Sequence, residues 1–251
     1  QSSVGVYSQY RWLNPYLSTQ LGARLERYSL DAEEKGIETY HVSFFRNIPI
    51  IDINTIATIK TGYKLPSIYQ RFSSYGDENL NAEASKTKEI SFSKQFQNIK
   101  GVMTYFDSEI TDQIKWHETT YMYFNKKEKL SVSGWEYMLS LIDLPLIEFA
   151  KIAYTNFTKY GDKVPDYKFT SSMGFKRGKV NVGIFTTIFG NTKKPDKYPS
   201  YFYTDLTVNY QFNDGFDIFG KVHNVFNKDY ETNKGYNEAG RTLFFGLKKS
   251  F

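Results

Sequence analysis

The segment "RTLFFGLKKSF" (residues 241–251) alternates with a period of two. Its most apolar residues share one parity: Leu243, Phe245, Leu247 and Phe251. The other parity is mixed: Thr242, Phe244, Gly246, Lys248 and Ser250. Because successive side chains of a strand point to opposite faces, the segment predicts a strand with one apolar face. The fold class depends on what covers that face.

The amino-acid composition favours a lipid environment for such faces. Aromatic residues make up 18% of the 251 residues, with 21 Tyr and 21 Phe, yet only 40% of the residues are hydrophobic. A globular core would draw more on Leu, Val and Ile. A membrane β-barrel combines aromatic girdles with one lipid-facing and one water-facing side of each strand, and it matches this composition.

The same alternation recurs along the chain, for example in 89–96, 180–189 and 200–212. No run reaches the length of about 18 uncharged apolar residues that a membrane-spanning helix needs. The richest run, 138–154, contains four interrupting residues: Asp143, Pro145, Glu148 and Lys151. If the chain enters a membrane, it therefore does so as a barrel of strands.

About thirteen strands are predicted, and the connections between them alternate in length. The strands are expected at 4–13, 18–29, 37–46, 51–63, 86–96, 99–117, 121–140, 146–157, 164–175, 178–189, 200–212, 216–226 and 239–251. Short connections are expected at 14–16, 97–98, 176–179 and 213–215, and long ones at 64–85, 190–199 and 227–238. Short turns on one side and long loops on the other are typical of bacterial outer-membrane barrels, whereas a soluble β-sandwich gives no reason for them.

Other function classes find little support. The chain has no cysteine, which excludes disulfides and thiolate metal sites. Its net charge of +5 comes from scattered Lys and Arg residues without a nucleic-acid-binding motif, so no nucleic-acid partner is expected.

The start of the sequence lacks the pattern of a signal peptide, which leaves three possibilities open: a mature chain, a fragment or a cytosolic protein. His41, His117 and His223 lie on separate predicted strands without ligand-like spacing, so we expect no metal site and no cofactor.

Three stretches together resemble a known family. The segment "GKVHNVFNKDYETNKGYNEAGRTLFFGLKKSF" (220–251) resembles the carboxy-terminal signature of TonB-dependent outer-membrane receptors. The matching residues are Asn224, Val225, Phe226, Tyr230, Gly235, Tyr236, Gly240, Arg241 and Phe251, with Val225 in place of the usual Leu. The stretch 62–96 resembles a second family motif through Pro66, Ser67, Asn79, Leu80, Glu83, Ser85 and Glu89, although Asp77, Glu78 and Ala82 depart from it. The stretch 123–137 resembles a third through Asn125, Gly134 and Glu136.

The resemblance implies an all-β fold, a transmembrane antiparallel barrel of about 22 strands plugged by an amino-terminal domain. The thirteen strands of residues 1–251 would be the carboxy-terminal part of that barrel, without the plug domain and the first barrel strands. The family imports scarce metal chelates across the bacterial outer membrane with energy from the TonB complex, which contacts the plug. The closing run looks like that of vitamin B12 receptors, while ferric-siderophore receptors share the rest. Such a protein is a transport receptor and not an enzyme.

The resemblance also implies where a substrate would bind. Candidate contacts lie on the long loops, where aromatic faces stack on ligands and basic groups attract an anionic chelate. These candidates are Tyr69, Arg71, Phe72, Tyr75, Lys193, Lys194, Tyr198 and Tyr236. Alternatively, the tyrosines form the interface girdle and the lysines contact phosphates of lipopolysaccharide, a partner expected together with outer-membrane lipid. Gly246, Leu247 and Phe251 match the signal that the barrel assembly machine recognises.

Three other functions remain open from the sequence. A passive porin of fewer strands would be complete within a chain of this length. A barrel enzyme would need a Ser–His or paired-acid site, and none of the three histidines lies in such a motif. A soluble β-rich binding protein would share the alternating strands.

Overall fold

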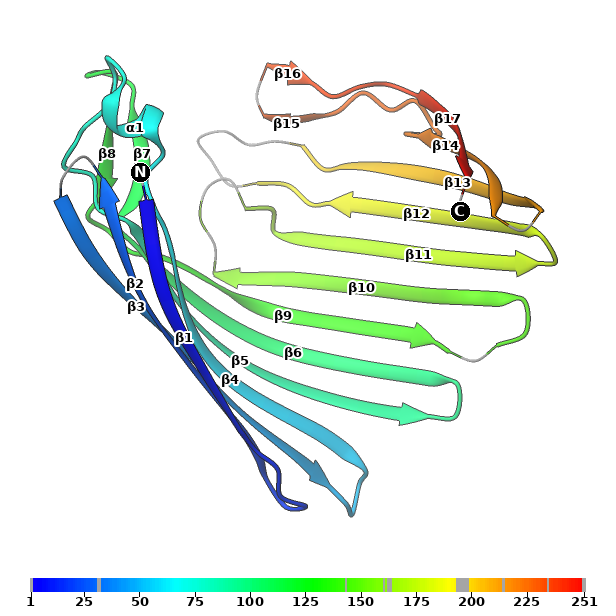
Figure 1. Cartoon of the computed structure of the whole chain (residues 1–251). Helices are drawn as coiled ribbons and strands as arrows, with labels where there is room; N and C mark the ends of the chain where they lie inside the picture. The colour runs from blue at the N-terminus through cyan, green and yellow to red at the C-terminus, as the bar shows by residue number, and fades with distance from the viewer. Residues whose placement is uncertain are drawn as a thin grey trace. The chain divides into compact units, whose positions relative to one another are not determined.

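A computed structural model of the chain describes residues 2–30, 33–142, 144–159, 161, 164–192, 199–213, 215–233 and 235–249. The chain divides into two compact units, Gln1–Phe92 with Thr104–Ser133, and Ser93–Met103 with Gly134–Phe251. Thirteen strands form one antiparallel sheet in the order β1-β2-β3-β4-β5-β6-β9-β10-β11-β12-β13-β14-β17 (Figure 1). The predicted number of strands is therefore confirmed. No helix in these residues is long and apolar enough to span a membrane.

The strand bounds follow the alternating segments of the sequence. The first eight strands are β1 Ser2–Trp12, β2 Ser18–Leu30, β3 Glu33–Ile48, β4 Ile53–Lys64, β5 Glu83–Phe96, β6 Ile99–Thr111, β7 Gln113–His117 and β8 Met122–Lys126. The remaining strands are β9 Leu130–Leu141, β10 Ile147–Lys159, β11 Tyr167–Arg177, β12 Val180–Phe189, β13 Tyr201–Asn213, β14 Phe216–His223, β15 Glu231–Asn233, β16 Tyr236–Asn237 and β17 Thr242–Lys249. The single helix of the described residues, α1, spans Ile68–Phe72.

The connections alternate in length as predicted. Short turns join β1 to β2, β5 to β6, β11 to β12 and β13 to β14. The connections at the other strand ends, which we call the long-loop side, include the α1 loop (65–82), the β7–β8 hairpin and the β15–β16 segment. One connection on that side departs from the pattern, because β2 ends at Leu30 and β3 begins at Glu33.

Two predicted strands are each split in the structure, and a third ends three residues early. The prediction of one strand over 99–117 and another over 121–140 is wrong, because β6 ends at Thr111 and β7 pairs with β8 in a separate two-stranded sheet. The break falls at Asp112, whose φ of 54° lies in the left-handed region and interrupts the ladder. The strand predicted over 216–226 ends at His223, because Asn224 adopts a φ of 50°.

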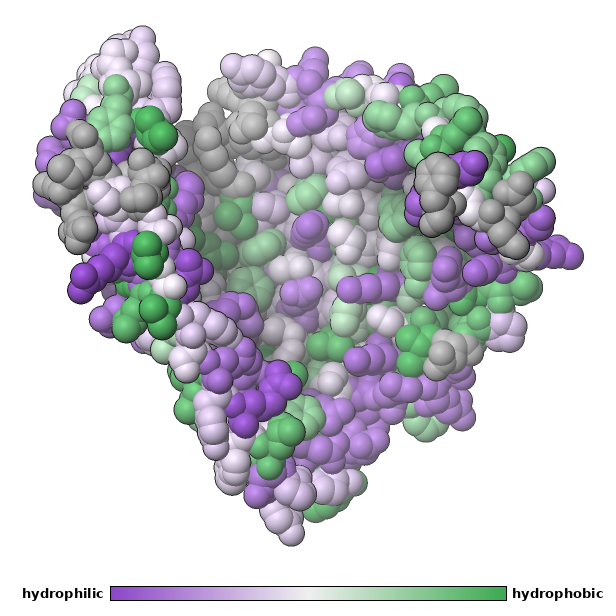
Figure 2. Space-filling model, in the orientation of Figure 1, coloured by the Kyte–Doolittle hydropathy of each residue, from purple (hydrophilic) through white to green (hydrophobic). Residues whose placement is uncertain are grey.

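The sheet has a polar face and an apolar face in each unit. In the first unit the register aligns Arg11 with Gln20 and Gln20 with Ser43 on the polar face. In the second unit it aligns an apolar row across four strands: Ile184, Leu206, Val222 and Leu243. Within the described residues, Pro66 aside, only five hydrophobic side chains are buried, while Leu243 is 74% and Phe245 77% exposed. Figure 2 shows such apolar side chains gathered over the β14 and β17 end of the chain. This exposure is the arrangement of a lipid-facing strand surface.

Candidate functional site

The predicted substrate contacts fall in different places. Tyr69, Arg71 and Phe72 lie in α1, and Tyr75 follows it in the α1 loop. Tyr236 lies in β16 and is 76% exposed. Lys193, Lys194 and Tyr198 lie outside the described residues. The structure therefore brings together the candidates of the α1 loop in the first unit, whereas Tyr236 belongs to the second unit.

The α1 loop is ordered by its own side chains. Ser67 and Gln70 form a capping box, in which the Gln70 N–H donates to Ser67 Oγ (3.1 Å) and the Ser67 N–H donates to Gln70 Oε1 (2.9 Å). Pro66 is fully buried, and Leu80 is 3% exposed. A Cβ on Gly76 would lie 2.4 Å from the Arg71 carbonyl oxygen, so only glycine fits there. The motif residues Pro66, Ser67 and Leu80, together with Gln70 and Gly76, therefore fix the conformation of the loop.

Arg71 is a structural residue of this loop. Its side chain is buried, its Nε donates to the Glu78 carbonyl (2.9 Å), and one of its terminal nitrogens donates to the same oxygen. Its guanidinium also lies 5.0 Å from the centre of the Phe72 ring. Because two of its donors are used on a backbone carbonyl within the loop, the geometry favours a loop-forming role for Arg71.

Asn125 fastens the β7–β8 hairpin to the α1 loop. Its Oδ1 accepts from the Asn81 N–H (2.7 Å), and its Nδ2 donates to the carbonyls of Asn81 (3.1 Å) and Asp112 (2.7 Å). A backbone bond from the Tyr123 N–H to the Tyr75 carbonyl (3.0 Å) adds to this connection. As a result, aromatic residues of two separate chain segments lie side by side, as Figure 1 shows for α1, β7 and β8.

These residues form an aromatic cluster with Trp116 at its centre, defined as Tyr69, Tyr75, Trp116, Tyr121 and Tyr123. The Trp116 ring lies 5.1 Å from the Tyr123 ring, 5.6 Å from Tyr75 and 6.2 Å from Tyr121, all edge-on. Tyr69 contacts Tyr123 at 6.2 Å. Trp116 is 39% and Tyr69 58% exposed, so the cluster offers ring faces and hydroxyl groups to a ligand.

Sequence reasoning found Tyr69 and Tyr75 but missed the other three members. The sequence places Trp116, Tyr121 and Tyr123 on two predicted strands of the barrel wall, where aromatic residues are ordinary girdle residues. The polar run "HETT" (117–120) is the signal that could have placed a turn there. His117 belongs to this turn, and its Nδ1 accepts from the Thr120 N–H (3.3 Å).

The polar face of the first unit holds two adjoining grooves. One, of about 330 Å³, is lined by residues that include Tyr7, Gln9 and Arg24. The other, of about 470 Å³, includes Arg11 and Ser43, and Gln20 and His41 line both. His41 Nε2 lies 2.9 Å from Ser43 Oγ, which is a local hydrogen bond. In the described part of the chain, no three His, Cys, Asp or Glu side chains come together to hold a metal ion.

In the second unit, a polar network surrounds Asp205. Its carboxylate accepts from His223 Nδ1 (2.8 Å) and the Asn224 N–H (3.2 Å) and pairs with Lys221 Nζ (2.9 Å). The ring of Tyr230 stacks between those of Tyr201 (4.9 Å) and Tyr203 (5.6 Å). Burial raises the pKa of the Tyr230 hydroxyl, whose oxygen lies 3.5 Å from His223 Nε2. This network folds the segment after β14 onto the polar face.

Two members of the expected assembly signal lie in β17, and the third, Phe251, lies outside the described residues. Leu247 is on the apolar face and 59% exposed. Gly246 is on the polar face, directly opposite Phe219 in the register. A Cβ at Gly246 would lie 2.4 Å from the Phe219 ring, so this glycine makes room for the aromatic side chain.

Comparison with known proteins places the chain in one family, on which a family model and a curated relative agree. Residues 1–225 match a family model described as TonB dependent receptor-like, beta-barrel. A vitamin B12 transporter, BtuB of Vibrio cholerae serotype O1, is 26% identical over 239 residues, which cover 88% of this chain and 38% of the transporter.

Solved structures show the same fold. The siderophore receptor PirA from Acinetobacter baumannii has a TM-score of 0.76 and 19% identity, covering 99% of this chain and 46% of the receptor. The ferric enterobactin receptor PfeA from Pseudomonas aeruginosa has a TM-score of 0.78 and 18% identity, covering 99% and 45%. The chain thus spans less than half the length of these relatives.

Proposed function

Because this chain belongs to the TonB-dependent receptor-like β-barrel family, we propose that its full-length protein imports a scarce metal chelate across the bacterial outer membrane with energy from the TonB complex. The observation that carries the proposal is the exposed aromatic cluster on the long-loop side. Loops on that side of an outer-membrane barrel face the outside, where the chelate arrives.

The chelate is a ferric siderophore or a cobalamin. The named relatives include a vitamin B12 transporter and siderophore receptors, so both classes of chelate are candidates. The rings of Tyr69, Tyr75 and Trp116 provide apolar faces against which a flat ligand packs, and the tyrosine hydroxyls supply hydrogen bonds. This form of contact suits the aromatic groups of a catecholate and the flat ring of a corrin alike.

In the full-length protein, residues 1–251 would form the carboxy-terminal portion of the barrel. An amino-terminal plug, with the first barrel strands, would complete the substrate site and carry the contact with the TonB complex. The polar face, with Arg24, His41 and Asp205, would line the interior of the barrel. Gly246 and Leu247 would belong to the end that the barrel assembly machine recognises.

A fluorescence titration of the full-length receptor tests the substrate assignment. Trp116 lies within the cluster and serves as the reporter, and Trp116→Phe identifies its share of the signal. The receptor is titrated with cyanocobalamin and, separately, with ferric enterobactin. Saturable quenching by one ligand, reduced in Trp116→Phe, supports the proposal and shows whether the substrate is a cobalamin or a ferric siderophore. Absence of saturable quenching by both, in a receptor shown to be folded, contradicts it.

A further inference from the structure

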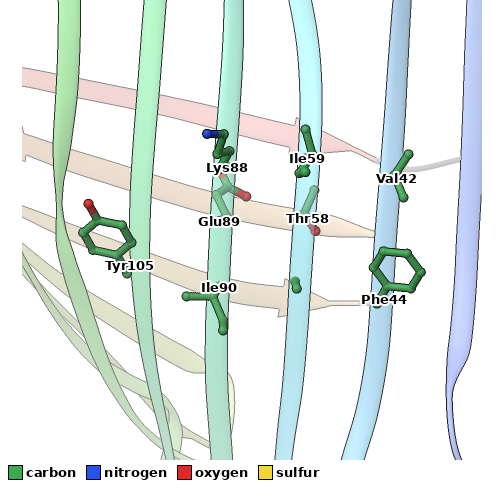
Figure 3. Close-up of a pocket in the computed structure, with 9 residues that line it drawn as sticks. Val42, Phe44, Thr58, Ile59, Lys88, Glu89, Ile90 and Tyr105 are labelled. Atoms are coloured by element: carbon green, nitrogen blue, oxygen red, sulfur yellow. The ribbon is translucent and has the colours of Figure 1, made fainter.

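An apolar groove of about 340 Å³ crosses four neighbouring strands, β3 to β6, on the apolar face of the first unit (Figure 3). Its lining is largely apolar and includes the side chains of Val42, Phe44, Ala57, Ile59, Ile90 and Tyr105. The groove lies on the opposite face from the two polar grooves and belongs to neither the aromatic cluster nor the barrel interior.

The shape of the groove follows from the strand register. Ala57 lies opposite Phe44, and Ile59 lies opposite Val42. The small Ala57 side chain thus leaves a depression between larger neighbours. Phe44 is 45% and Ile59 40% exposed, so the walls are open to the surroundings. A depression of this kind accepts an alkyl chain without displacing any side chain.

One end of the groove carries a positive charge. Lys88 lines the groove and precedes Ile90 on β5, which runs from the long-loop side at Glu83 to a short turn after Phe96. Figure 3 accordingly shows Lys88 at the same end as Val42 and Ile59, and Ile90 and Phe44 at the other. The ammonium group therefore lies toward the long-loop side of the groove.

Within the part of the chain that the structure describes, Lys88 has no carboxylate partner. Its neighbour Glu89 projects to the other face and pairs with Lys60 at 2.9 Å. A lysine on the lipid-facing surface of a barrel is unfavourable in a depth-dependent way, and its stem reaches toward the headgroups. A phosphate at the height of Lys88 would compensate the charge.

We propose that this groove binds lipid A of the outer leaflet, with a phosphate on Lys88 and one acyl chain along Ala57 and Ile90. The order of the groups along the groove matches a lipid of that leaflet, whose phosphate lies toward the outside and whose chains point inward. The proposal rests on the outer-membrane placement of the proposed function. Because the long-loop side faces the outer leaflet, the lipid at this groove is lipid A.

The test measures lipid A retained by the full-length receptor. Receptor purified from outer membranes in mild detergent is analysed by native mass spectrometry for bound lipid A. Lys88→Ala removes the cation, and Ala57→Leu fills the depression. Lys94→Ala is the matched control, because Lys94 lies on the same face of β5 nearer the short turn. Retention is expected to fall about tenfold in Lys88→Ala and clearly in Ala57→Leu, and to stay unchanged in Lys94→Ala.

Three results would overturn the proposal. They are unchanged retention in both groove variants, an equal loss in Lys94→Ala, and phosphatidylglycerol in place of lipid A as the bound lipid. Folding of each variant is checked by its heat-dependent mobility on gels. Chelate uptake is measured in parallel and is expected to be unaffected, so failure of uptake by the unaltered receptor counts against the proposed function and not against the lipid site.

Discussion

The Asn224 side chain makes two hydrogen bonds to the backbone of one residue, Lys228, and a longer third one to the Ala239 carbonyl (3.5 Å). Its Nδ2 donates to the Lys228 carbonyl (2.8 Å), and its Oδ1 accepts from the Lys228 N–H (3.0 Å). Asn224 is fully buried and has a φ of 50°. In the same segment, Arg241 Nε donates to the Val225 carbonyl (2.9 Å). The carboxy-terminal signature of the family therefore has a structural explanation here, since its residues hold this segment against the sheet.

Replacing Asn224 should destabilise the folded receptor. Asn224→Gly tolerates the positive φ but loses the amide, which should lower the free energy of unfolding by about 1–3 kcal/mol. Asn224→Ala adds backbone strain and should be less stable still. The measurement is the temperature at which the full-length receptor loses its folded mobility on gels. A Gly variant as stable as the unaltered protein would show that these hydrogen bonds contribute nothing.

A side chain at Gly246 should prevent β17 from packing. In Gly246→Ala the added methyl group meets the Phe219 ring, so the yield of folded receptor should fall severalfold. The double variant Phe219→Ala with Gly246→Ala should recover part of the yield. Gly101→Ala in β6 is the control, because nothing lies within 4 Å of its added Cβ. If Gly246→Ala behaves like Gly101→Ala, the packing explanation is wrong.

Loss of Asn125 should separate the hairpin from the α1 loop. Asn125→Ala removes two hydrogen bonds to Asn81 in the α1 loop and one to the Asp112 carbonyl, so limited proteolysis should cut within 65–82 at least several times faster. Asn79→Ala is the control, since the side chain of the exposed Asn79 donates to Asp77 within the same loop. Equal cleavage rates in the two variants would contradict the role assigned to Asn125.

Removal of the central ring should weaken ligand binding. Trp116→Ala deletes the side chain that contacts Tyr75, Tyr121 and Tyr123, so the Kd of the transported chelate should rise roughly tenfold. Calorimetric titration of the full-length receptor measures it. Trp12→Phe on the apolar face of β1 should leave the Kd unchanged. An unchanged Kd in Trp116→Ala would move the binding site away from the cluster.

The sequence predicted the sheet well because alternation is a local property. The parity of Leu243, Phe245 and Leu247 identified the apolar face, and the Phe219–Gly246 pair lies on the other face as the parity requires. The β7–β8 hairpin could not be predicted in the same way. Its strands also alternate, and the break depends on the conformation of Asp112 and on Asn125, which binds a carbonyl 13 residues away.

The binding site was predicted only in part for a related reason. Tyr69 and Tyr75 lie in a long loop, where exposed aromatic residues attract notice in the sequence. Trp116 joins them only through tertiary contacts between the α1 loop and the hairpin. The burial of Arg71 likewise depends on the fold of its loop, so its charge alone pointed to a ligand contact.

Uptake of a radiolabelled chelate by whole cells tests the central claim most directly. Cells that lack their own receptors for cobalamin and enterobactin would express the full-length protein, with and without a functional TonB complex. We predict that one chelate accumulates in cells with the TonB complex and that accumulation falls to background without it. Equal accumulation in both strains would indicate passive permeation and would contradict TonB-driven import.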